Sequence, residues 1–113
     1  MISNFLKVID LSKYNDICLD AIRESEVGNY SFIKGDSSYD TNKQFLFTSK
    51  LIPLAKEIQL NIKNYTEEFT IEPSLMSSSW FNILYKGGVV EKHQHAESWE
   101  TKNDSMISGA YYP

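Results

Sequence analysis

Two histidines and a glutamate stand at alternate positions in one short stretch of this sequence. His93, His95 and Glu97 lie in "HQHAE", and the chain has no other histidine. If this stretch is extended, the three side chains project to one face, because side chains alternate along a strand. Two neutral imidazole nitrogens and a carboxylate are ligand types of a non-haem Fe(II) centre that keeps positions open. The spacing therefore predicts a metal site, and no residue is singled out as catalytic.

The competing interpretation of the same stretch is ordinary surface chemistry. His93 and His95 are then two solvated imidazoles, and Glu97 is a solvated acid at the start of the acidic segment "ESWETKND". The spacing alone leaves both interpretations open, so the elements that position these residues have to decide between them.

The first half of the chain is expected to be mainly helical. After a short strand over 5–9, Ser12 is expected to cap a helix that ends near 25–28. Residues 28–44 read as loop with one short strand at 30–33, and a second helix is expected from Ser49 to about Glu68, with Pro53 in its first turn. The expected buried stripes are Tyr14, Ile17, Cys18, Ala21 and Ile22 in the first helix, and Leu51, Leu54, Ala55, Ile58, Ile62 and Tyr65 in the second.

The second half changes to a period of two. Residues 80–85 alternate as in a strand, Gly87 and Gly88 break the run, and a further strand is expected over 105–113. Helices followed by strands predict an α+β fold in a single domain spanning 1–113.

Several separate elements in this half stand in a recognisable order. They are Trp80-x-Asn82, Gly87-Gly88, His93-x-His95 and Ser108-Gly109-x-x-Tyr112. The pattern resembles the first part of the Fe(II)- and 2-oxoglutarate-dependent oxygenases, in particular a family frequent in marine bacteria and phages. The resemblance implies two helices, within about 1–72, packed on the first strands, within about 77–113, of a double-stranded β-helix (jelly roll).

The resemblance also implies a chemistry. Fe(II) would be held at His93 and His95, with His95 standing where most of the superfamily has Asp or Glu, and Glu97 is kept as a further ligand. The co-substrate 2-oxoglutarate would contact Tyr112, Tyr85 and Asn82, and the enzyme would hydroxylate a small molecule or a protein side chain. For Tyr85 and Tyr112 the alternative is core packing, and for Asn82 it is a structural hydrogen bond.

The chain departs from the oxygenase pattern in two ways. It has no third histidine, and its only arginine, Arg23, falls in the first predicted helix. We therefore expect the chain to be the truncated N-terminal part of such an oxygenase, inactive by itself, which forms a homodimer to cover its strand edges. The alternative is a complete non-enzymatic α+β binding or oligomerisation protein, whose histidine pair is incidental or binds a metal at an interface.

Composition and net charge limit the classes of partner that we expect for this protein. The net charge of −4 and the absence of a Lys/Arg cluster argue against nucleic acid. The single cysteine excludes an internal disulfide, and the apolar runs are too short for a membrane span, so we expect a cytoplasmic protein that does not bind membranes. Frequent Lys, Asn and Ile suit an AT-rich genome, such as that of a phage in an infected host.

Overall fold

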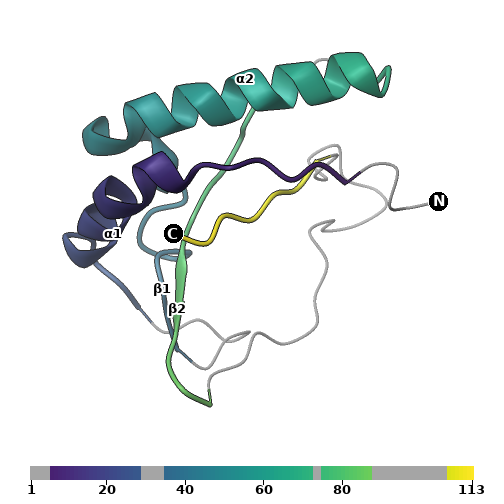
Figure 1. The fold of residues 1–113 in the computed structure, drawn as a ribbon. Helices are drawn as coiled ribbons and strands as arrows, with labels where there is room; N and C mark the ends of the chain where they lie inside the picture. Colours follow the sequence, from purple (N-terminus) through teal and green to yellow (C-terminus); the bar gives the residue numbers. More distant parts are fainter. Residues whose placement is uncertain (1–5, 29–34, 73–74, 88–106) are drawn as a thin grey trace.

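The computed structural model describes residues 6–28, 35–72, 75–87 and 107–113, and these form a mixed helical and sheet structure (Figure 1). The elements are α1 (Asn15–Arg23), β1 (Gly35–Ser37), α2 (Ile52–Glu68) and β2 (Asn82–Leu84), with short 3-10 turns at Ser12–Tyr14, Phe45–Phe47 and Ser49–Leu51. The strands form a two-stranded antiparallel sheet. The expected α+β composition is therefore confirmed at this level.

The long helix α2 follows the sequence pattern closely. A 3-10 turn at Ser49–Leu51 leads directly into it, so the helical segment begins at the predicted residue. Pro53 lies in the first turn, where its missing N–H leaves no helical hydrogen bond unmade. Leu51, Leu54 and Ala55 of the predicted stripe are buried. Burial of this stripe fixes α2 against the rest of the chain.

Helix α1 begins later than predicted. The expected N-cap at Ser12 is wrong, because Ser12 opens a 3-10 turn and α1 starts at Asn15 without a side-chain cap. The backbone N–H of Ser12 instead donates to the carboxylate of Asp10 at 2.9 Å. Of the positions expected to be buried, Cys18 and Ala21 lie in the core, whereas Ile17 is exposed.

The sheet joins two segments that are far apart in sequence. Gly35 lies opposite Leu84, and Ser37 lies opposite Asn82. A Cβ at Gly35 would collide with the carbonyl group of Ile83, so the close approach of the strands requires glycine. The prediction of loop structure over 28–44 is wrong at β1, because pairing with β2 makes a strand of a small, polar sequence.

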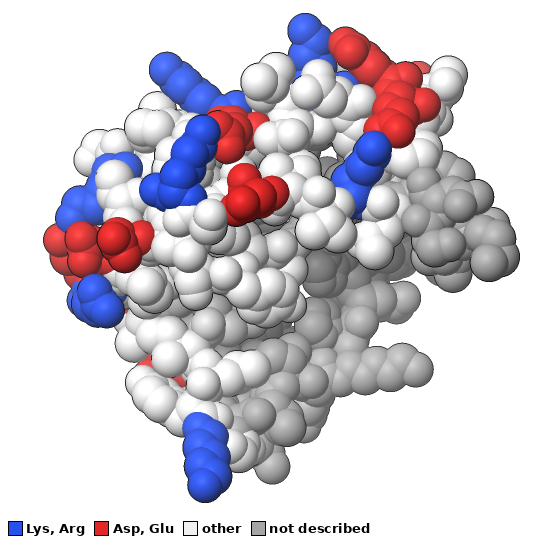
Figure 2. Space-filling model, viewed as in Figure 1, with Lys and Arg blue, Asp and Glu red and all other residues white. Residues whose placement is uncertain are grey.

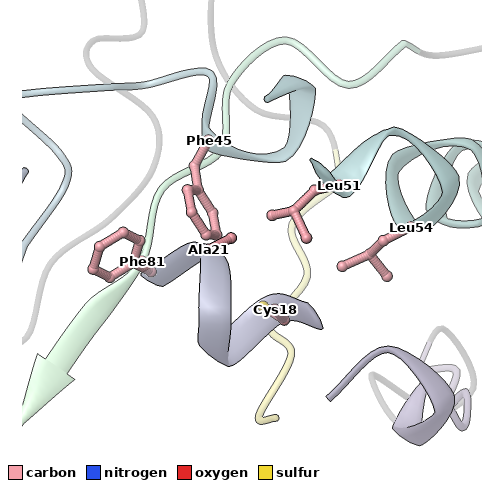
Figure 3. Close-up of a cluster of buried hydrophobic side chains, with 6 residues drawn as sticks. All are labelled: Cys18, Ala21, Phe45, Leu51, Leu54 and Phe81. Atoms are coloured by element: carbon pink, nitrogen blue, oxygen red, sulfur yellow. The ribbon is translucent and has the colours of Figure 1, made fainter. Parts of the chain in front are cut away.

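One hydrophobic cluster connects the helices to the sheet (Figure 3). Phe45 and Phe81 pack edge to face with ring centroids 4.7 Å apart. Phe81 directly precedes β2, so this contact links the sheet to the helical layer. The buried members of the cluster are Cys18, Ala21, Phe45, Leu51, Leu54 and Phe81.

Two predicted strands are wrong over the residues that the structure describes. Residues 6–10 and 107–113 contain no strand, and the side chains of Leu6 and Val8 are exposed. A strand needs a neighbouring strand to complete its backbone hydrogen bonds, and within the described ranges neither segment has one. The strand expected at 30–33 lies outside the described residues.

None of the helices in the described ranges has both the length and the apolar character needed to cross a bilayer.

Candidate functional site

The three candidate metal ligands, His93, His95 and Glu97, lie outside the described residues. Within the described ranges no group of three or more His, Cys, Asp or Glu side chains is placed to share an ion. The donor set itself fits a ferrous ion, since two imidazoles and a carboxylate are suitable ligands. The metal site therefore stays a prediction from sequence.

The chain leads toward this stretch through β2 and a turn. Gly87 has a φ of +84°, in the left-handed region that favours glycine. The turn expected after residue 85 is therefore present at Lys86 and Gly87, while Gly88 lies outside the described residues.

Asn82 takes part in holding the two strands together. Its side-chain oxygen accepts a hydrogen bond of 2.7 Å from the hydroxyl of Ser37, its register partner on β1. The same hydroxyl lies 3.1 Å from the carbonyl oxygen of Phe81 and accepts from the backbone N–H of Tyr39 at 3.0 Å. This geometry matches the structural role that was the alternative for Asn82.

Tyr85 follows β2 and points its hydroxyl at an acid. The phenol donates to the Oδ2 atom of Asp36 at 3.0 Å, while 62% of the residue's surface remains exposed. The hydrogen bond to Asp36, followed by the negative charge of that carboxylate, raises the pKa of Tyr85. A dicarboxylate approaching this phenol would meet like charge, so a contact between Tyr85 and 2-oxoglutarate would require the bond to Asp36 to open.

The two neighbouring C-terminal tyrosines have different surroundings. Tyr112 is 87% exposed. Tyr111 packs against the core and donates its hydroxyl to the side-chain oxygen of Asn15 at 2.6 Å. Burial is the first cause that raises the pKa of Tyr111, and Cys18 adds to it. The sequence analysis singled out Tyr112 and missed Tyr111. Adjacent side chains of an extended chain face opposite ways, so only one of these two tyrosines can face inward.

Two surface grooves lie along α2 among the described residues, and Asn82, Tyr85 and Tyr112 line neither of them. The larger groove, about 450 Å³, is lined by Lys56, Gln59, Leu60, Lys63, Thr66, Glu67 and Leu75. The smaller, about 230 Å³, is lined by Phe47, Ile52, Ala55, Lys56 and Gln59. Lys56, Gln59 and Lys63 lie outside the apolar stripe from which this helix was predicted, so the sequence pattern did not indicate the apolar groove beside them.

The oxygenase resemblance also implies a basic residue, usually Arg, that pairs with the carboxylate of the co-substrate. Arg23 lies on α1, where it is exposed and pairs with Asp20 at 3.2 Å. Lys43 stands over the ring of Tyr39 at 4.2 Å, and Tyr39 in turn packs edge to face on Trp80. Trp80 therefore has a packing role.

In comparisons with known proteins, no family model, no curated protein and no solved structure matches this chain.

Proposed function

We propose that this chain carries the metal-binding part of an Fe(II)- and 2-oxoglutarate-dependent oxygenase. The observation that carries the proposal is the run His93-x-His95-x-Glu97 behind the strand that begins at Asn82 and the turn at Gly87. The proposal assigns β1 and β2 to the first strands of a double-stranded β-helix, and α1 and α2 to its supporting layer. The formation of β2 and the positive φ of Gly87 support it.

The proposed work of the protein is to hold the ion and its co-substrate. His93 and His95 bind through neutral imidazole nitrogens and Glu97 through its carboxylate, so acidification below the usual histidine pKa of about 6.5 weakens metal binding. When bound, the ferrous ion supplies the chemistry that couples oxygen reduction to 2-oxoglutarate decarboxylation and substrate hydroxylation. Tyr112, Tyr85 and Asn82 are the proposed contacts of 2-oxoglutarate, and the substrate is a small molecule or a protein side chain.

A second candidate function is a non-enzymatic α+β binding protein whose histidine pair binds zinc or nickel. It is favoured by the surroundings of Tyr85, whose hydroxyl is already engaged by the carboxylate of Asp36. Such a site would bind a metal without responding to 2-oxoglutarate, because nothing there would recognise the dicarboxylate.

Anaerobic calorimetric titration with Fe(II), with and without 2-oxoglutarate, separates the two. The oxygenase proposal expects one ion per chain, tighter binding with 2-oxoglutarate, and loss of binding in the variant His93→Ala/His95→Ala. Succinate, a dicarboxylate without the 2-oxo group, is the matched control and should not tighten binding. Metal binding that ignores 2-oxoglutarate supports the second candidate, and binding that survives the double substitution contradicts both.

The variant Asp36→Asn, which changes the hydrogen-bond partner of Tyr85, tests the role of Tyr85 separately. If Tyr85 contacts the co-substrate, removing the negative charge beside it should strengthen the effect of 2-oxoglutarate. Asp40→Asn, at an exposed acid outside the Tyr85 hydrogen bond, is the matched control. A co-substrate effect that is equal in both variants argues against a role for Tyr85.

A further inference from the structure

Helix α2 has a second face, on the side away from its core stripe. Lys56, Leu60, Lys63 and Glu67 follow one another at steps of three and four residues, so they lie on one face of the helix. The larger groove lies along this face, with Leu75 as a further wall. The smaller groove shares Lys56 and Gln59 with it, so the two form one continuous surface. We call this surface the outer face of α2.

The outer face combines exposed apolar side chains with three charged side chains. Leu60 is 55% exposed and Leu75 is 85% exposed. In the part of the chain that the structure describes, Lys56, Lys63 and Glu67 make no ion pair. Three lysines outside this face are paired, namely Lys7 with Glu68, Lys13 with Glu57 and Lys50 with Glu24. Figure 2 shows positive and negative side chains interspersed along the top of the molecule, where α2 runs.

We propose that the outer face of α2 is the contact surface of a symmetric homodimer, in which α2 packs antiparallel on α2 of a second copy. Lys56 and Glu67 are eleven residues apart, which is three helical turns or about 16 Å along the axis. With a twofold axis on this face, level with the midpoint between Asn61 and Ile62, Lys56 of each copy faces Glu67 of the other, and Leu60 meets the aliphatic stem of Lys63. The outer face is thus complementary to itself in charge.

Other occupants fit this charge pattern less well. An acidic peptide would satisfy Lys56 and Lys63 but would place like charge against Glu67, and an anionic membrane would do the same. A second copy supplies both signs at the required spacing. The contact of one helical face is small, so the dimer is expected to be weak and dependent on concentration. The proposal uses no residue of the proposed metal site and differs from a dimer formed at strand edges.

Sedimentation velocity over a range of protein concentrations, with a chelator present to exclude metal-bridged species, tests the dimer. Lys56→Glu and Glu67→Lys should each weaken dimerisation about tenfold, because each places like charges opposite one another twice. The double variant Lys56→Glu/Glu67→Lys should restore it. Lys86→Glu, at an exposed lysine in the turn after β2, is the matched control and should leave dimerisation unchanged.

Three outcomes overturn the proposal: a monomer at every concentration, a dimer that is indifferent to both single substitutions, or a double variant no better than the singles. A monomer that binds vesicles of anionic lipid assigns the outer face to a membrane instead. Leu60→Ser adds a readout that is independent of charge and should also weaken the dimer. Far-UV circular dichroism checks that each variant keeps its helices, since all of these positions are exposed.

Discussion

Ser38 and Phe81 are joined by two hydrogen bonds across the interior. The backbone N–H of Ser38 donates to the carbonyl oxygen of Phe81 at 3.0 Å. The backbone N–H of Phe81 donates in return to the hydroxyl of Ser38, also at 3.0 Å. Ser38 is fully buried, and Phe81 belongs to the hydrophobic cluster. This pair therefore fixes the point at which the sheet meets the core.

Ser38→Ala should destabilise the protein by about 1–3 kcal/mol, because the buried N–H of Phe81 loses its acceptor. The free energy of unfolding from urea denaturation measures the effect. Ser78→Ala, at an exposed serine, is the matched control and should change stability by less than about 0.5 kcal/mol. Equal effects of the two substitutions would contradict the role assigned to the Ser38 hydroxyl.

Gly35→Ala should disrupt the pairing of β1 with β2, because the added Cβ collides with the carbonyl group of Ile83. We expect a loss of about 1–3 kcal/mol in unfolding free energy, typical of overpacking. Gly28→Ala is the matched control, since a Cβ there meets no atom within 4 Å. Thermal and urea denaturation measure the stability of both variants. If Gly35→Ala were as stable as Gly28→Ala, the two strands would be able to separate without a loss of stability.

Leu54→Ala should leave a cavity at the centre of the helical layer, because Leu54 is fully buried in the hydrophobic cluster. The expected loss is about 2–5 kcal/mol in the free energy of unfolding. Leu6→Ala removes the same atoms from an exposed position and should cost far less. The same urea denaturation measures both variants. A Leu54→Ala protein as stable as Leu6→Ala would mean that α2 is not held by its core stripe.

The sequence predicted α2 well for a physical reason. Its apolar side chains repeat at helical spacing over four turns, so burial of one stripe and the local backbone preference favour the same structure. The same pattern gave no indication of the outer face. Lys56 and Lys63 are charged residues outside the apolar stripe, and Leu60 between them is a single apolar residue. A helix with a regular apolar stripe on its core side can carry a second contact surface on another side, and the spacing of the apolar stripe does not reveal it.

The strands were harder to predict, because a strand depends on its partner. The sequence Gly35-Asp36-Ser37 has low strand preference, yet it pairs with β2 through backbone bonds and through Ser37. Val8 and Ile9 are β-branched residues with high strand preference, yet the structure places them outside any strand. Pairing across more than forty residues of sequence is not encoded in either segment alone. Of the predicted site residues, the structure places Asn82, Tyr85 and Tyr112. Asn82 and Tyr85 bond to side chains of β1, whereas Tyr112 is exposed.

The phenol of Tyr85 should titrate above its ordinary pKa of 10.0, because the protonated form donates to Asp36 and the ionised form would be repelled by it. A pKa that is raised on folding means that the bond stabilises the native state below pH 10, and that this contribution is lost as the pH rises through the folded pKa. Asp36→Asn should lower the pKa of Tyr85 toward its ordinary value. NMR titration of ring-labelled tyrosine measures both proteins, and an unchanged Tyr85 pKa in Asp36→Asn would mean that the carboxylate does not hold the phenol in solution.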